Sequence, residues 1–307
     1  MPVIVVAGRA IGRAVLTTCA VALGVFLVTD VLPGDAALAR TRGGADAAEL
    51  ARLREESGLD GPVWERFAMW AWSLLRGDAG TSLLSDRPVT TLIAQRLPAT
   101  LTLAGCALAV TVPLMLALAW WAGARARRSY AGGVLAASAA VPQVVVAAAA
   151  VAVLSGLLGW FPRVSLLPVG ASPWSAPEAL VLPTLSLALP ATAYGAGLLS
   201  GVVADVRGRP HVDDAVLRGI GPWHVATRHL LPLLWAPTVR ITAVIAGGLV
   251  AATTVVETVF GYTGLGELLV SSVAARDVPV VQAVALLGAC VVIAGNTAAD
   301  LVRGGRG

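Results

Sequence analysis

Lysine is absent from this sequence, and all 22 basic residues are arginine. The P-loop that binds nucleotide phosphates needs the lysine of GxxxxGK[ST], so its absence excludes that kind of ATP-hydrolysing site from the chain. Charged residues of either sign are also scarce, at 13% of 307 residues. Soluble globular domains contain about 25% charged residues, so the composition excludes an ordinary soluble domain.

Cysteine and histidine are equally rare. Cys19, Cys106 and Cys290 each lie in an apolar run and form neither a disulfide framework nor a metal site, so we interpret them as small buried hydrophobes. His224 and His229 are five residues apart and would face different sides of a helix, which disfavours a metal site. HExxH and paired catalytic motifs are missing too. We therefore expect no enzyme activity and no bound cofactor.

Long apolar runs dominate what is present. The chain is 57% hydrophobic, with a mean hydropathy of +0.80. A helix needs about 20 mostly apolar residues to cross the hydrocarbon layer. Six stretches meet this criterion: residues 13–32, 98–121, 133–158, 179–203, 237–256 and 279–301. The sequence thus predicts an all-α polytopic membrane protein with six transmembrane helices.

Arginine in the short loops indicates the orientation of these spans. With the N-terminus in the cytoplasm, the short outside loops contain only Arg163 and Arg276, and the other short segments with arginine are cytoplasmic. Both termini are then cytoplasmic, and the long segment 33–97 lies outside. A signal peptide cleaved near residues 34–40 is the alternative, but the apolar run before it is longer than a usual signal sequence.

This orientation divides the chain into four parts. They are the N-terminus with the first span (1–32), the extracytoplasmic segment (33–97), a core of five spans (98–301) containing a cytoplasmic loop (204–236), and a short cytoplasmic tail (302–307). Within the extracytoplasmic segment, residues 46–59 have the pattern of an amphipathic helix. Four aromatic residues follow: Trp64, Phe67, Trp70 and Trp72. They either pack against the extracytoplasmic part of the protein or lie at the membrane interface, and we favour packing.

The cytoplasmic loop contains an unusually polar stretch, "DDAVLRGIGPWHVATRHLLP" (213–232), between two apolar runs. Asp213 and Asp214 stand where a helix N-terminus favours negative charge, and Gly219 interrupts the helix. Pro222 suits the first turn of a second helix. We expect two short helices, joined by a glycine elbow, on the cytoplasmic surface, with the second one ending at Pro232.

The stretch resembles the EAA loop of ABC importer permeases, whose pattern is E-A-A, three residues, Gly, nine residues and I-x-L-P. The matching positions here are Asp213, Asp214, Ala215, Gly219, Leu231 and Pro232, with His229 in place of isoleucine. "LRGIGPWHVATRHLLP" is closer still to the peptide-permease branch. "FLVTDVLPGDAALA" (26–39), residues 57–104 and residues 255–302 also resemble that branch, so the similarity extends over nearly the whole chain.

The chain therefore resembles the permease subunits of dipeptide, oligopeptide and nickel importers. The resemblance implies a bacterial inner-membrane protein that pairs with a second homologous permease, two ABC ATPase subunits and an extracytoplasmic substrate-binding protein, without a nucleic-acid partner. ATP hydrolysis would occur on the ATPases. Peptides are the expected cargo, with nickel or a metal chelate as the alternative. The loop residues expected to transmit the motion are Asp213, Asp214, Ala215, Arg218, Gly219, Arg228, Leu231 and Pro232.

A second candidate site follows the fifth span. In "ETVFGYTGLGELL", Glu257 is followed by Gly261, Gly264 and Gly266, which permit tight backbone turns. By resemblance, these four residues lie near the external mouth of the pathway, although Glu257 could equally make a structural hydrogen bond.

An ion-driven secondary transporter is the alternative from another class. It would predict ionisable residues in the middle of the membrane and inverted repeats. No repeat is visible, and the candidate ionisable residues all lie near span ends: Asp30, Arg240, Glu257 and Asp300.

Overall fold

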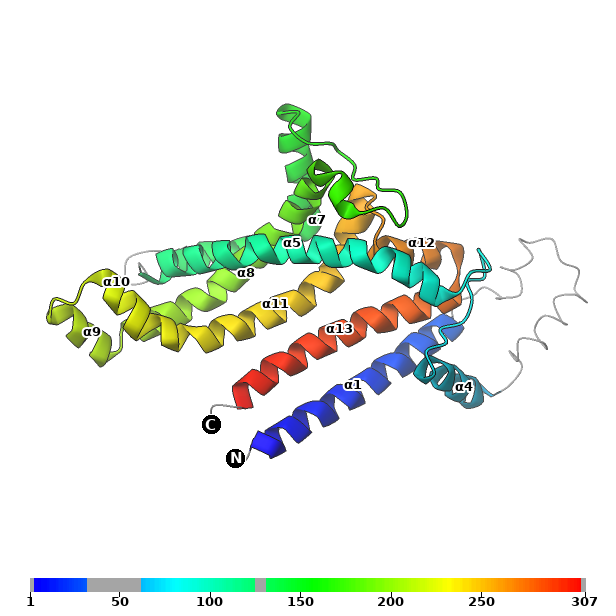
Figure 1. Ribbon diagram of the computed structural model, residues 1–307, viewed down its shortest axis with the longest axis horizontal. Coiled ribbons are helices and arrows are strands. Elements are labelled where there is room, and N and C mark those ends of the chain that lie inside the picture. Colours follow the sequence, from blue (N-terminus) through cyan, green and yellow to red (C-terminus); the bar gives the residue numbers. More distant parts are fainter. Residues whose placement is uncertain (1–2, 32–61, 125–130, 305–307) are drawn as a thin grey trace, which may run out of the picture.

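The computed structural model describes residues 3–31, 62–124 and 131–304 (Figure 1). Five of its helices are long and apolar enough to cross a membrane. They are α1 (Val3–Val31), α5 (Val89–Ala124), α8 (Pro177–Arg207), α11 (Leu231–Phe260) and α13 (Val278–Gly304). The predicted all-α polytopic fold is confirmed. Helix α5 begins at Val89, within the predicted extracytoplasmic segment 33–97.

The third predicted span, 133–158, is not one continuous helix. It consists of α6 (Ala131–Ala139), then α7 (Gln143–Ala150), which continues as the π-helix η1 (Val151–Leu157). The two halves meet at an angle of 88°. Pro142 has a non-helical ψ of 135°, and a proline also disfavours helical geometry in the residue before it. The described residues therefore contain five continuous helices that are long and apolar enough to span a membrane, or six such spans if the bent pair counts as one.

Helix α8 continues through two prolines. Pro183 and Pro190 both lie inside one helix that runs from Pro177 to Arg207. Small residues let α8 pack closely on its neighbours. A Cβ added to Gly195 would lie 2.7 Å from the Cδ1 atom of Ile245 in α11. Helices α8 and α11 therefore pack closely at this position.

The connecting helices lie at two opposite ends of the long helices. Helices α9 (Pro210–Leu217) and α10 (Pro222–Val225) connect α8 to α11 at one end, toward which the described chain termini also lie (Figure 1). Helices α4 (Val63–Leu75) and α12 (Leu265–Ala275) lie at the other end. We call these the loop end and the cap end of the molecule.

Helix α4 is attached to the cap end of α1 by aromatic packing. The rings of Phe67 and Trp70 lie 5.5 and 5.6 Å from that of Phe26, whereas Trp64 and Trp72 are exposed. Packing, the favoured alternative, is therefore seen for Phe67 and Trp70. The amphipathic helix predicted at 46–59 lies outside the described residues.

Candidate functional site

The polar loop forms a short helix that is stopped by a glycine, as predicted. Helix α9 begins at Pro210, so Asp214 lies in its middle rather than at its start. The N–H of Ile220 donates to the carbonyl of Ala215 at 3.2 Å, and Gly219 between them has φ of +76°. A positive φ of this size carries a steric penalty for any residue with a Cβ. The predicted turn at Gly219 is confirmed.

The second half of the loop differs from the prediction. Helix α10 does not end at Pro232 but passes through a π-helical turn, η3 (Ala226–Leu230), directly into α11. Pro232 is the second residue of α11 and directly follows this π turn. The loop therefore consists of one separate short helix and the extended start of a long one, joined at a glycine elbow.

One side of the elbow is anchored to the core. Val212, Ala215, Val225 and Leu230 are buried and belong to the main hydrophobic cluster of the long helices. Burying side chains of this kind contributes on the order of 1 to 3 kcal/mol each, depending on size. This packing attaches the elbow to the ends of α8 and α11.

The other side of the elbow is exposed and mixed in chemistry. Leu217 and Trp223 are 85% and 80% exposed. Asp214 and Arg218 form an ion pair of 2.7 Å on the surface of α9, which contributes little to stability because both groups are solvated. The other exposed residues predicted to act in this loop are Gly219, Arg228, Leu231 and Pro232. Asp213 lies in α9, but its side chain is outside the described part.

At the cap end, Glu257 is fully buried near the C-terminus of α11 and binds the start of α12. Its Oε2 atom accepts hydrogen bonds from the backbone N–H groups of Gly266 at 2.6 Å and Glu267 at 3.3 Å. Its Oε1 atom accepts one from the hydroxyl of Thr100 at 2.7 Å. The first N–H groups of a helix have no partner within the helix, and a carboxylate complements the positive end of the helix dipole. Glu257 therefore caps α12 from another helix.

The glycines predicted beside Glu257 are needed for this approach. A Cβ on Gly264 would clash with the carboxyl group of Glu257, and one on Gly266 would clash with the backbone of Thr254. Gly261 ends α11 with φ of +64°. The structure thus brings all four predicted residues of this site together, each with a distinct geometric role.

Tyr262 completes the turn between α11 and α12. Its N–H donates to the carbonyl of Glu257 at 2.8 Å, and its hydroxyl donates to the carbonyl of Ala99 at 3.0 Å. Burial, together with the nearby carboxylate of Glu257, raises the pKa of Tyr262 above its ordinary value. The hydroxyl therefore stays protonated and remains a donor to α5 across the physiological range.

Further contacts at the cap end were missed by sequence reasoning. Arg96 in α5 pairs with Glu267 in α12, and Asp277, at the α12–α13 junction, accepts a hydrogen bond from the N–H of Leu83 at 3.0 Å and another from the hydroxyl of Ser82. These partners are 171 to 195 residues apart in sequence. In the sequence, a charged residue beside an apolar run indicates that the residue has a role, but it does not indicate which distant residue it contacts.

The fold and these two regions together define a polytopic α-helical membrane protein with an anchored, exposed loop at one end and a hydrogen-bonded cap at the other. Residues 109–304 match the family described as "Binding-protein-dependent transport system inner membrane component". Since that match spans more than half of the 307 residues, the chain belongs to this family of ABC importer permeases.

Relatives of nearly equal length support the same assignment. A protein of Brucella abortus (strain 2308), named as a peptide transport system permease, is 31% identical over 96% of this chain and 95% of the relative. The glutathione transport system permease protein GsiC of Pectobacterium atrosepticum is 34% identical over 91% and 89%. GsiC of Salmonella choleraesuis is 32% identical over 93% and 92%. The predicted membership of the peptide-type permease family is confirmed.

Proposed function

We propose that this chain forms half of the translocation pathway of an ATP-driven importer for di- or oligopeptides. The other half would come from a second homologous permease, with two ABC ATPases on the cytoplasmic side and an extracytoplasmic protein that delivers the substrate. The peptide and glutathione names of the full-length relatives support this cargo class. Nickel remains the alternative cargo within the family.

The elbow around Gly219 is the observation that carries the proposed coupling role. Its inner side is buried against α8 and α11, and its outer side presents Leu217 and Trp223. A permease without a nucleotide site has to receive the energy of ATP binding through contact. Large exposed apolar side chains surrounded by charges are the kind of surface on which binding energy concentrates. A push on this surface would shift the ends of both long helices together.

The proposed orientation places the elbow and both termini in the cytoplasm. The arginine distribution supports it, and the elbow lies toward the same end of the helices as the described chain ends (Figure 1). The cap end would then face the binding protein. There Glu257 and its glycines would brace the mouth of the pathway by fixing α12 against α5 and α11, rather than by contacting cargo, since Glu257 is 0% exposed.

The docking part of the proposal is tested with the pair Leu217→Ser and Trp223→Ser. We expect the double variant to insert into the membrane and pair with the partner permease, but to lose most of the co-purifying ATPase. Trp174→Ser is the matched control, because Trp174 is also highly exposed, at 63%, but precedes α8 at the opposite end. Equal ATPase retention in the double variant and the control would contradict docking at the elbow.

The cargo and the energy source are tested by uptake in cells that depend on this transporter. We expect a labelled dipeptide or tripeptide to be taken up and to compete with unlabelled peptides, and nickel not to compete. Uptake should stop when ATP is depleted and persist when an ionophore removes the ion gradients. Uptake that follows the ion gradient instead would support the secondary transporter.

A further inference from the structure

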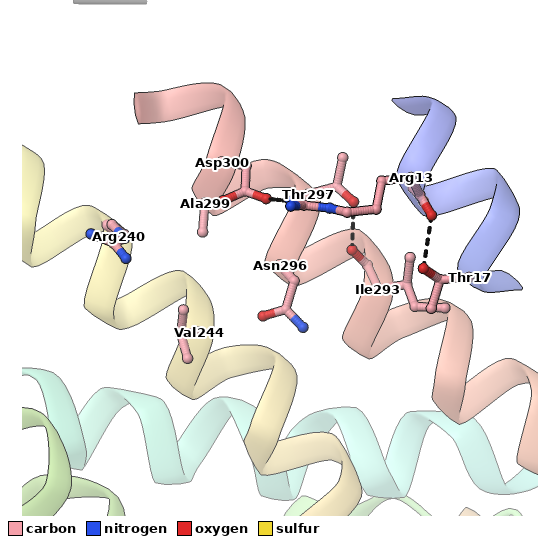
Figure 2. Close-up of a pocket in the computed structure, with 10 residues that line it drawn as sticks. Arg13, Thr17, Arg240, Val244, Ile293, Asn296, Thr297, Ala299 and Asp300 are labelled. Carbon is pink, nitrogen blue, oxygen red and sulfur yellow. Dashed lines mark hydrogen bonds and ion pairs between the residues drawn. The ribbon is translucent and has the colours of Figure 1, made fainter. Parts of the chain in front are cut away.

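A polar pocket of about 380 Å³ lies between α1, α11 and α13, toward the loop end (Figure 2). Its charged lining residues are Arg13 from α1, Arg240 from α11 and Asp300 from α13. Asn296 and Thr297 of α13 lie between them. None of these residues belongs to the elbow or to the cap.

Only some of the charged side chains in this pocket have an ion-pair partner. Arg13 pairs with Asp300, which makes those two groups together neutral. Arg240 lies on the other side of the pocket, and within the described residues neither it nor Asn296 has a hydrogen bond or an ion pair. With two arginines and one aspartate, the pocket carries a net charge of +1. An unpaired guanidinium opposite a free amide is suited to a phosphate.

The three ionisable residues also lie at a common depth. Arg13 begins the apolar run 13–32, Arg240 lies near the start of 237–256, and Asp300 lies near the end of 279–301. Residues at such positions stand where the hydrocarbon layer meets the lipid headgroups. The turn of α1 that supplies Arg13 also exposes Ile11, Val15 and Leu16, so the pocket adjoins an apolar surface.

We propose that this pocket binds the phosphate headgroup of an anionic phospholipid in the leaflet on the side of the loop end. Arg240 is the main phosphate ligand, Asn296 donates a hydrogen bond, and Arg13 is held beside them by Asp300. Basic pockets between transmembrane helices are known to bind such headgroups. The bound lipid would cross-link α1, α11 and α13 at their loop ends. The inference requires only that the chain spans a membrane, not the proposed cargo or coupling.

The test uses the full chain, purified in a mild detergent and titrated with phosphatidylglycerol, phosphatidylcholine or inorganic phosphate while bound lipid is counted by native mass spectrometry. We expect saturable binding of phosphatidylglycerol that Arg240→Gln weakens about fivefold, the equivalent of about 1 kcal/mol for one basic residue at an anionic membrane surface. Arg240→Lys should retain part of the binding.

Arg163→Gln is the matched control, since it removes one exposed arginine from the loop before α8. Equal weakening by Arg163→Gln and Arg240→Gln would show a nonspecific charge effect and overturn the proposal. Equal binding of phosphatidylcholine, or displacement of the lipid by millimolar inorganic phosphate, would also overturn an anionic lipid site. Loss of the lipid when the assembled transporter replaces the single chain would identify the pocket as a contact between subunits instead.

Discussion

The carboxylate of Glu257 lies 2.6 Å from the backbone nitrogen of Gly266 and binds the first turn of α12 from the end of α11. The same carboxylate holds Thr100 of α5, whose hydroxyl oxygen in turn accepts the N–H of Leu265 at 2.8 Å. One buried side chain thus connects three helices at the cap end. This arrangement explains why an acidic residue occupies a fully buried position at the end of an apolar span.

Glu257→Gln should destabilise the protein. Glutamine replaces one carboxylate oxygen with a donor, so either the hydrogen bond from Thr100 or the pair from α12 is lost. Leaving a buried polar group without its partner costs about 1 to 3 kcal/mol, and thermal unfolding of the purified chain should show a lower midpoint. Glu178→Gln, on an exposed residue at the start of α8, is the control. An unchanged midpoint for Glu257→Gln would mean that the cap contributes nothing.

Gly266→Ala should be destabilising for a steric reason. The added methyl group would meet the backbone of Thr254, which cannot move without shifting α11. Overpacking of this kind costs about 1 to 3 kcal/mol. Gly248→Ala is the matched control on α11, because a Cβ there meets nothing within 4 Å and alanine favours the helix. Equal unfolding temperatures for the two variants would contradict this steric role of Gly266.

The helical membrane fold could be predicted from the length of the apolar runs, because a run of about 20 apolar residues is long enough to form a transmembrane helix. The turn at Gly219 could be predicted because glycine between a short helix and a proline is a strong local signal. The break at Pro142 was missed, since the surrounding run stays apolar on both sides. The continuation of α10 into α11 was missed because a π-helical turn has no distinctive composition.

The partners of the cap residues lie beyond the reach of local patterns. Nothing near Glu257 indicates that Thr100 faces it, because a single threonine in an apolar run looks like any other. The pairing of Asp277 with Ser82 and Leu83 is determined by how three helices pack, not by spacing along the chain. Local chemistry marked Glu257 and its glycines, and only the packed structure showed what they hold.

Asp277→Ala should loosen the turn that precedes α5. The aspartate is 3% exposed and accepts the N–H of Leu83, so its removal frees that amide. Local opening that becomes easier by about 1.4 kcal/mol raises the exchange rate roughly tenfold. Hydrogen exchange of a peptide covering residues 82–87 measures this change, with Asp205→Ala on an exposed residue of α8 as the control. Unaltered exchange in that peptide would exclude Asp277 as the anchor of the turn.

The central claim is that the elbow at Gly219 transmits the motion of the ATPases. Gly219→Glu is its most direct test, because a side chain at φ of +76° forces the chain out of the turn. Gly221→Glu adds the same charge and bulk two residues away, where no positive φ is required and a Cβ meets nothing within 4 Å. ATPase retention and substrate uptake are measured for both. We predict that the Gly219→Glu variant inserts normally but loses the ATPases or hydrolyses ATP without transport, and that Gly221→Glu is much less affected. Normal ATPase retention and normal uptake for Gly219→Glu would contradict the claim.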